Sequence, residues 1–178
     1  KTWWCRWTWN WSSRIIQTKR RSIRKVKKEL QLEGKKVIIS GGAKGIGASI
    51  VKSFANEGAI PIILGRNPEE ARSLLEEIGV GHTFHLELTN LEEIQQTAKK
   101  ISEEIGIIDI LVNNAGVNDG VSLSDNPSKF IESLQKNLIH PFALAHYFIE
   151  DLKNNKGCII NISSKVAVTG QGSTSGYA

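Results

Sequence analysis

A glycine-rich stretch, residues 40–47, has the composition of a turn that binds a phosphate group. It reads SGGAKGIG, follows a short apolar run at 37–40 and opens a stretch, 46–57, with apolar residues at helical spacing. Such a turn brings backbone N–H groups and a helix N-terminus close to a phosphate, and side chains would block that approach. The stretch lacks the Gly-Lys-Ser/Thr ending of a nucleoside triphosphatase loop, which argues against that class. We therefore expect cofactor contacts at Gly41, Lys44, Gly45, Ile46 and Gly47.

The end of the second apolar run indicates which nucleotide would be bound. Domains that bind NAD commonly place an acidic residue there, which holds the ribose 2′-hydroxyl. Here the run 60–64 ends in Gly65-Arg66-Asn67, with no acid, and Lys44 lies in the glycine turn. Two cations suit a 2′-phosphate, so these residues favour NADP over NAD. The alternative reading of Arg66 is a solvated surface charge.

Five apolar runs alternate with helical patterns along the chain from residue 35 onward. This alternation predicts a parallel sheet with right-handed crossovers and helices on both faces. The expected fold is α/β, a Rossmann-like doubly wound sheet in three α/β/α layers. Asn67, Asn90 and Asn126 are expected to cap helices. The expected strands are 37–40, 60–64, 83–88, 107–112 and 157–162, and the expected helices are 46–57, 68–78, 91–105 and 127–154.

Charge is divided unevenly along the chain. The 178 residues carry a net charge of +5, but residues 1–36 hold twelve Lys or Arg against two Glu, and the remainder has a net charge of −5. All five tryptophans lie between Trp3 and Trp11, and there is no methionine. This predicts a disordered or extraneous head-piece at 1–31 before a domain at 32–178. Interleaved Trp and Lys/Arg could instead bind single-stranded nucleic acid or an anionic membrane surface, and we favour extraneous sequence over both.

The cysteines and the apolar runs indicate in which cellular compartment the protein is expected. Cys5 and Cys158 cannot form a disulfide framework, and two free thiols indicate a reducing compartment. No apolar run reaches the roughly 18 residues of a spanning helix, and the first residues lack the apolar stretch of a signal peptide. We expect a cytoplasmic protein that does not associate with a membrane.

Five motifs in a fixed order resemble those of the short-chain dehydrogenase/reductase family. The resemblance covers 32–178, and the part from 113 to 177 is most similar to bacterial sugar dehydrogenases of the L-fucose type. It implies an oxidoreductase that transfers hydride between NADP(H) or NAD(H) and a secondary alcohol or ketone. The motifs are Gly41-x3-Gly45-Ile46-Gly47, Asn113-Asn114-Ala115-Gly116, Asn137-Leu138, Asn161-Ile162-Ser163-Ser164, and Tyr177 thirteen residues after Ser164.

The resemblance assigns catalytic roles to three residues. Tyr177 would exchange a proton with the substrate oxygen, and Ser164 would hydrogen-bond that oxygen, with Ser163 as the competing residue. Asn137 resembles the residue in whose region the family holds a water for proton relay. Because Pro141 has no N–H, the carbonyl of Asn137 loses its helical partner, and we expect it to bind that water where the helix kinks.

The resemblance also implies cofactor contacts at Glu87, Leu88, Asn114, Ala115 and Gly116. Glu87 stands where the family usually has Asp, and Asn114 could instead tie neighbouring strands together. Residues 170–176 are rich in Gly, Ser and Thr, which suits a polyhydroxylated substrate better than a fatty acyl group or a steroid. We expect His140 and His146 to be packing or surface groups and no metal to be bound.

The family carries a Lys four residues after its catalytic Tyr, a position beyond residue 178. We therefore expect the 178-residue chain to be truncated after Tyr177, to bind cofactor weakly and to catalyse poorly, and the full-length protein to be a homo-oligomer. Two other readings stay open. One is a non-catalytic module that binds a nucleotide or, through its basic head-piece, a nucleic acid. The other is a 3-oxoacyl-(acyl-carrier-protein) reductase-like enzyme.

Overall fold

The structure is a computed structural model that describes residues 30–169, 172 and 174–177. The chain divides into two units, Lys1–Gln31 and Leu32–Ala178, and the fold below is that of the second unit. The predicted head-piece lies outside the described residues except for its last two positions, 30 and 31. The predictions made for it stay predictions.

A single sheet of five parallel strands forms the centre of the unit, in the order β3-β2-β1-β4-β5. Ile38 of β1 lies opposite Ile62 of β2 and Leu111 of β4. The strand order reverses at β1, because β2 follows on one side and β4 on the other, and ligands bind at such switch points in open α/β sheets. The strands are β1 (Lys36–Ser40), β2 (Ile60–Gly65), β3 (His82–His85), β4 (Ile110–Asn113) and β5 (Cys158–Asn161).

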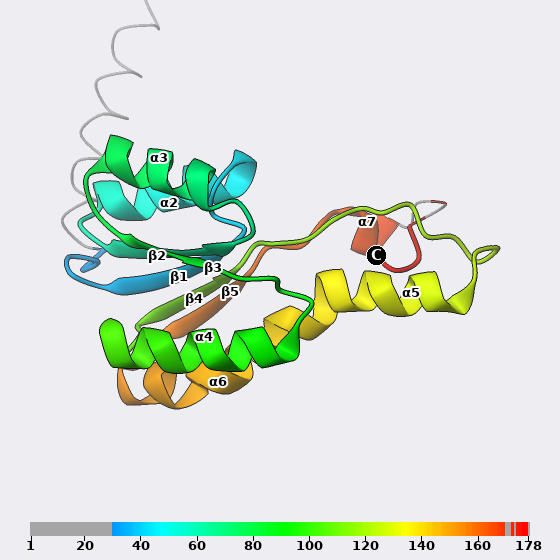
Figure 1. Cartoon of the computed structure of the whole chain (residues 1–178). Coiled ribbons are helices and arrows are strands. Elements are labelled where there is room, and N and C mark those ends of the chain that lie inside the picture. Colours follow the sequence, from blue (N-terminus) through cyan, green and yellow to red (C-terminus); the bar gives the residue numbers. More distant parts are fainter. Residues whose placement is uncertain (1–29, 170–171, 173, 178) are drawn as a thin grey trace, which may run out of the picture. The chain divides into compact units, whose positions relative to one another are not determined.

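Helices cover both faces of this sheet, with α2 and α3 on one face and α4 and α6 on the other (Figure 1). Along β1, Ile38 belongs to one core cluster, while Val37 and Ile39 belong to the other, and all three are fully buried. The predicted three-layer α/β/α fold is confirmed. The helices are α2 (Gly45–Asn56), α3 (Pro68–Ile78), α4 (Leu91–Glu104), α5 (Pro127–Leu134), η1 (Gln135–Ile139), α6 (His140–Asn154) and α7 (Val166–Thr169).

Three strands are shorter than the sequence predicts, and the fifth, predicted over 157–162, covers only Cys158–Asn161. The third strand, predicted to residue 88, ends at His85, so Glu87 lies in the loop that follows. The fourth strand, predicted from residue 107, begins at Ile110. Ile108 donates its backbone N–H to an Asp151 carboxylate oxygen on α6, at 3.1 Å, and is therefore not part of the strand ladder.

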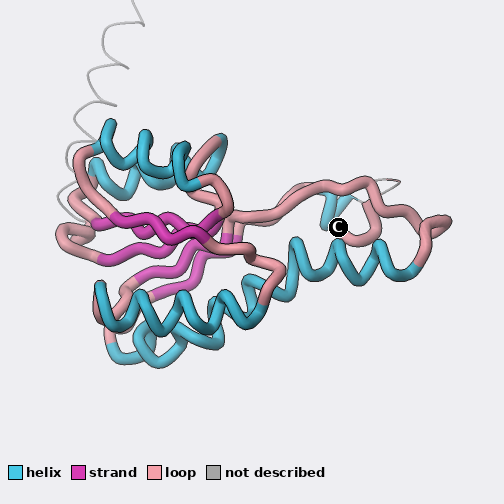
Figure 2. The backbone as a smooth tube through the Cα atoms, in the orientation of Figure 1, coloured by secondary structure: helices cyan, strands magenta, loops and turns pink. Residues whose placement is uncertain are grey.

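The helix predicted over 127–154 consists of three segments. The α-helical pattern stops at Leu134, continues as the π-helical segment η1 and resumes at His140. Pro141 explains the irregularity, because it lacks the N–H that an α-helix would direct at the carbonyl of Asn137. The expected departure from a regular helix between these two residues is therefore present. Helix α5, before the break, extends away from the sheet (Figure 2).

All three predicted N-cap residues stand at the N-cap positions of their helices, and the side chains of two of them form capping hydrogen bonds. The Asn90 side chain accepts hydrogen bonds from the N–H groups of Glu92 and Glu93, and the Asn126 side chain accepts one from Ser128. At Asn67 the prediction of a side-chain cap is wrong. The Asn67 amide nitrogen donates to Glu70 at 3.0 Å, and its amide oxygen accepts no hydrogen bond from the first turn of α3.

Within the described residues, no helix is long and apolar enough to cross a membrane.

Candidate active site

One cavity of about 1420 Å³ lies at the carboxyl ends of the strands. Predicted site residues that are far apart in the chain come together in this cavity. Gly45 is the one predicted site residue that does not line it. The predicted residues that do line it are Gly41, Lys44, Ile46, Gly47, Arg66, Glu87, Leu88, Asn114, Ala115, Gly116, Asn137, Ser164 and Tyr177.

The glycine turn is packed closely against the end of β4. A Cβ on Gly47 would lie 2.1 Å from the Gly41 carbonyl oxygen and 2.7 Å from the Asn114 amide nitrogen, and a Cβ on Gly41 would meet Ala115 at 3.0 Å. Gly41 also has a φ of +65°, which disfavours any side chain. The glycines therefore allow the backbone to pack closely, besides leaving room for a phosphate.

Gly45 has a different role in the same turn. Its φ is +57°, and a Cβ there would meet nothing within 4 Å. Glycine is favoured at this position because the backbone takes a left-handed conformation as α2 begins. The structure gives no support to a cofactor contact from Gly45.

Asn114 ties strands together, which was the alternative reading of this residue. Its amide nitrogen donates to the carbonyl oxygens of Ser40, at 3.0 Å, and Gly41, at 3.1 Å. The Ser40 hydroxyl in turn accepts the N–H groups of Asn114 and Ala115. Ser40 is fully buried, and its type and position in the sequence do not predict this role. These bonds join the carboxyl ends of β1 and β4 beneath the cavity.

Two cations border the cavity near the end of β2. Arg66 is mostly exposed and lies 3.7 Å from a Glu87 carboxylate oxygen. Lys44 is exposed, and no ion pair is seen for it among the residues that the structure describes. Partial burial acts to raise the pKa of the Glu87 carboxyl, but hydrogen bonds from Thr89 and the charges of Arg66 and His85 outweigh burial and hold that pKa below its usual value.

The side chain of Asn137 is fully engaged with the protein. Its Oδ1 accepts the N–H of Val117 at 2.7 Å, and its Nδ2 donates to the carbonyl oxygens of Val117 and Ser133, both at 3.0 Å. The side chain therefore fastens the loop after β4 to η1. If Asn137 takes part in proton relay, the backbone carbonyl that Pro141 leaves without an α-helical partner is the group available for it.

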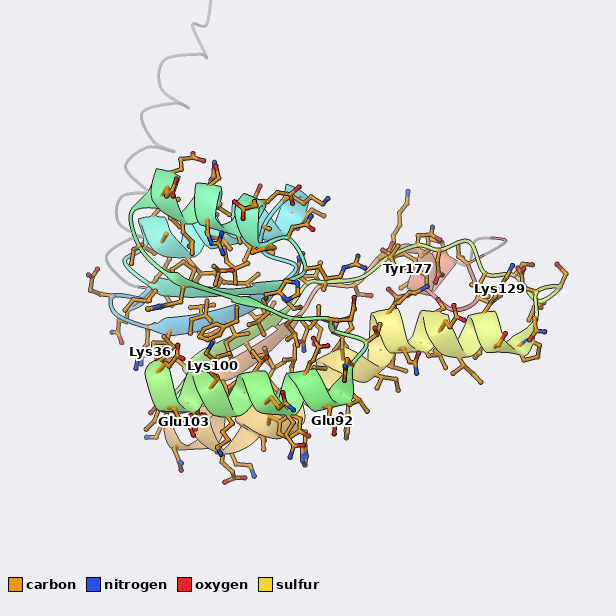
Figure 3. All side chains as sticks on the ribbon, viewed as in Figure 1. Lys36, Glu92, Lys100, Glu103, Lys129 and Tyr177 are labelled. Atoms are coloured by element: carbon orange, nitrogen blue, oxygen red, sulfur yellow. The ribbon has the colours of Figure 1, made fainter. Side chains whose placement is uncertain are left out.

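Tyr177 and Ser164 reach the cavity from two different segments. Tyr177 lies in the turn 174–177, beside α5 (Figure 3), where its N–H donates to the Thr174 carbonyl oxygen at 3.0 Å. Gly176 packs directly on Ser133 of α5, because a Cβ there would lie 2.4 Å from the Ser133 hydroxyl. Ser164 precedes α7, and its hydroxyl accepts the N–H of Val166 at 3.4 Å. Ser163 lines the same cavity, so the choice between the two serines stays a prediction.

His140 is a buried cavity residue at the junction of η1 and α6, as the expected packing role requires. Its Nε2 lies 2.9 Å from the Lys136 carbonyl oxygen, which fixes Nε2 as the donor, and its Nδ1 is buried with no partner among the described groups. Burial holds the pKa of His140 below its usual value, although the carbonyls of Lys136 and Ala115 and the charge of Glu87 act in the opposite direction. His146 is exposed.

Asp119 and Lys136 also line the cavity, and the sequence analysis assigned neither of them a role. The Asp119 side chain is 17% exposed and accepts a hydrogen bond from the Ser133 hydroxyl. No sequence motif marks this arrangement, because the loop after β4 and helix α5 are brought together only by the fold.

The fold and the cavity define a class: a doubly wound α/β domain with a glycine turn at the switch point of its sheet, as in dinucleotide-binding domains. The chain belongs to the family described as short chain dehydrogenase, whose sequence profile matches residues 35–178.

Two curated relatives illustrate the range of this family. The chain is 33% identical over 141 residues to an L-fucose dehydrogenase of Rattus norvegicus, covering 78% of this chain and 52% of that protein. It is 35% identical over 149 residues to a 3-oxoacyl-[acyl-carrier-protein] reductase of Aquifex aeolicus, covering 80% of this chain and 60% of that protein. The chain thus spans little more than half the length of these relatives.

Two solved structures share the fold. The Cj0485 dehydrogenase superimposes with a TM-score of 0.79 at 39% identity, covering 84% of this chain and 58% of that one. An alcohol dehydrogenase from the archaeon Thermococcus sibiricus, solved in complex with 5-hydroxy-NADP, gives a TM-score of 0.74 at 27% identity, covering 82% and 64%.

Proposed function

We propose that the protein containing this chain is an NADP(H)-dependent oxidoreductase that interconverts a secondary alcohol and its carbonyl form, with a sugar of the L-fucose type as substrate. The observation that carries the proposal is the shared cavity. It brings the glycine turn, the loop after β4, Asn137, Ser164 and Tyr177 to one place. The L-fucose dehydrogenase relatives support the choice of substrate.

The residues of the cavity fit a nicotinamide dinucleotide. The turn at Gly41 and Gly47 leaves no room for side chains and carries the N-terminus of α2, which favours a phosphate. Lys44 and Arg66 both line the cavity and would supply two positive charges for a 2′-phosphate, which supports NADP over NAD. Leu88, Ala115 and Gly116 would contact the rest of the cofactor. A cofactor held by these residues would supply the acceptor for the hydride that leaves the substrate carbon.

Residues of this chain would carry out the remaining steps. In oxidation, Tyr177 would accept the hydroxyl proton while Ser164 hydrogen-bonds the substrate oxygen. A neighbouring cation would assist this proton transfer by stabilising the phenolate form of Tyr177. The carbonyl of Asn137 would hold a water that passes the proton to solvent.

The likeness to 3-oxoacyl-[acyl-carrier-protein] reductases supports a second candidate function, the reduction of a 3-oxoacyl thioester. A nucleotide-binding module without catalysis is the third. We also propose a cytoplasmic location, which the free and exposed thiol of Cys158 supports. Large apolar side chains exposed on α5–α6, among them Ile131, Leu138 and Phe142, support a homo-oligomer.

Titration of the complete gene product with NADPH and NADH tests the cofactor assignment. We expect NADPH to bind at least about tenfold more tightly, and Arg66→Ala to remove most of that preference while leaving NADH binding unchanged. Arg72→Ala is the matched control, because Arg72 lies on α3, pairs with Glu69 and does not line the cavity. Equal affinity for the two cofactors would contradict the proposal of NADP.

Activity separates the three functions. NADP-dependent oxidation of L-fucose that Tyr177→Phe abolishes, with NADPH binding retained, supports the sugar dehydrogenase. Reduction of an acetoacetyl thioester without sugar oxidation supports the second function, and NADPH binding without turnover of either substrate supports the third. Salt-sensitive retention of nucleic acid that disappears on deletion of residues 1–28 would identify a nucleic-acid binder instead.

A further inference from the structure

We propose that Asp119 and Lys136 form a subsite for hydroxyl groups beside the reacting carbon of the substrate, and that this subsite selects a sugar or another polyol over an acyl thioester. The inference rests on the proposed function, because it concerns the substrate end of the same cavity.

The Asp119 carboxylate is held in place and shielded from solvent. Its side chain is 17% exposed, and the Ser133 hydroxyl donates to its Oδ1 at 2.8 Å. The ammonium of Lys136, on η1, lies 3.6 Å from its Oδ2. Both side chains belong to residues that line the cavity. The pair is therefore oriented by contacts from α5 and η1 before any substrate arrives.

This pair keeps hydrogen-bonding capacity for a ligand. An ionised carboxylate has about four acceptor positions and an ammonium has three donors. At 3.6 Å the contact between Lys136 and Asp119 is an ion pair too long for a hydrogen bond, and Oδ2 accepts no hydrogen bond from the residues that the structure describes. A carboxylate oxygen beside an ammonium can accept one substrate hydroxyl while the ammonium donates to a second.

Contacts connect this pair to the predicted catalytic residues. Ser133, which binds Asp119, also packs against Gly176, the residue before Tyr177. The Ser133 carbonyl oxygen accepts a hydrogen bond from Asn137. Ser133 therefore touches the aspartate, the segment that carries Tyr177 and the proposed relay residue, and this puts Asp119 at the catalytic end of the cavity.

The chemistry of the pair opposes an acyl chain. An alkyl group placed against a partly buried carboxylate would exclude water from it and offer no hydrogen bond in return, which is costly. Sites built to hydrogen-bond a substrate hydroxyl discriminate strongly against analogues that lack it. The cavity thus favours hydroxyls next to the carbon that is oxidised.

The test compares two cyclic substrates that carry the same reacting group. L-Fucose in its ring form has hydroxyls beside the hemiacetal carbon, and tetrahydropyran-2-ol has the hemiacetal without them. In the complete gene product we expect Asp119→Asn to lower kcat/KM for L-fucose by about 30-fold or more, mainly by raising KM, and to change kcat/KM for tetrahydropyran-2-ol by less than about threefold. Lys136→Met should likewise lower kcat/KM for L-fucose and leave kcat/KM for tetrahydropyran-2-ol nearly unchanged.

Glu132→Gln is the matched control. Glu132 faces the same lysine from the solvent side, at 4.0 Å, and is 61% exposed, so its substitution should leave both substrates unaffected. NADPH affinity and thermal unfolding of Asp119→Asn should match those of the unsubstituted protein.

Each other outcome decides against the inference in a distinguishable way. If Asp119→Asn and Lys136→Met weaken both substrates equally, or neither, the pair only anchors α5, and the inference is overturned. If the unsubstituted enzyme oxidises tetrahydropyran-2-ol as efficiently as L-fucose, the proposed subsite is overturned, but the proposed oxidoreductase function is not. An enzyme that oxidises neither substrate with NADP overturns the proposed function together with the inference.

Discussion

Strands β1 and β5 differ in how fully the rest of the domain covers them. Val37, Ile38 and Ile39 of β1 are completely buried, because strands lie on both sides and helices on both faces. All four residues of β5 are exposed, including Ile159 and Ile160, and β5 pairs only with β4 in the described part of the chain. Within the described residues, the buried core is therefore concentrated around β1, next to the glycine turn.

The two ends of the cavity show a related contrast. At the cofactor end, close backbone packing, as where Gly47 abuts the Gly41 carbonyl, acts together with the hydrogen bonds of the Ser40 and Asn114 side chains. At the substrate end, geometry is set by side-chain hydrogen bonds, such as those of Asn137 with Val117. We therefore expect Gly41 and Gly47 of the glycine turn to tolerate no added side chain, and the substrate end to depend on individual polar groups.

The largest expected effect compares the same truncation in the two strands. Ile39→Ala leaves a cavity in a fully covered core and should lower the free energy of unfolding by about 4 kcal/mol. Ile160→Ala removes a side chain that is 37% exposed and should cost about 1 kcal/mol or less. Urea unfolding of both variants measures the two losses. Similar losses would show that β5 is covered by structure beyond the described residues.

Adding one methyl group at Gly47 tests how closely the glycine turn is packed. Gly47→Ala forces a Cβ against the Gly41 carbonyl and should lower the free energy of unfolding by about 3 kcal/mol. NADPH binding should weaken at least about tenfold, because the turn must shift. Gly65→Ala is the control for stability, since its Cβ would meet nothing within 4 Å. If Gly47→Ala unfolded at the same urea concentration as the unsubstituted protein, the close packing at Gly47 would be contradicted.

A smaller effect is expected from acid, through the buried His140 at the junction of η1 and α6. Burial holds its pKa below the value of about 6.5 in the unfolded chain, so below that pH the unfolded state binds more protons. Stability should therefore fall as the pH drops from about 7 to about 5. His140→Gln can still donate to the Lys136 carbonyl and should reduce this loss, whereas His146→Gln, with an exposed side chain, should not. Equal pH dependence in all three proteins would exclude His140 as the cause.

The sequence is sufficient to predict the parallel sheet and its helices, because apolar periodicity and Asn-Pro or Gly signals act over a few neighbouring residues. Nearly all the site residues that it predicts do line the cavity, since strand ends and the glycine turn carry recognisable motifs. The π-helical segment is only partly predictable: Pro141 indicates a lost hydrogen bond but not how the backbone responds.

Other features depend on contacts between distant residues. Asp119 and Ser133 are fourteen positions apart and meet only after α5 folds back along the loop. The Ser40 hydroxyl finds its N–H partners more than seventy residues away. No local pattern encodes such pairs, and a single sequence cannot separate Gly45, needed for its backbone conformation, from Gly47, needed for space.

The smallest expected effect separates two helix starts that look alike in the sequence. Asn67 and Asn126 both precede proline, but only the Asn126 side chain accepts a hydrogen bond from the first turn of its helix. Asn126→Ala should therefore lower the free energy of unfolding by about 1 kcal/mol, as for other lost caps, and Asn67→Ala by no more than a few tenths. Urea unfolding of the two variants gives the comparison. Because α5 carries Ser133, which hydrogen-bonds Asp119, Asn126→Ala should also weaken binding of L-fucose while NADPH affinity is unchanged. Equal losses of stability at both positions would mean that the Asn67 side chain turns to cap α3 in solution.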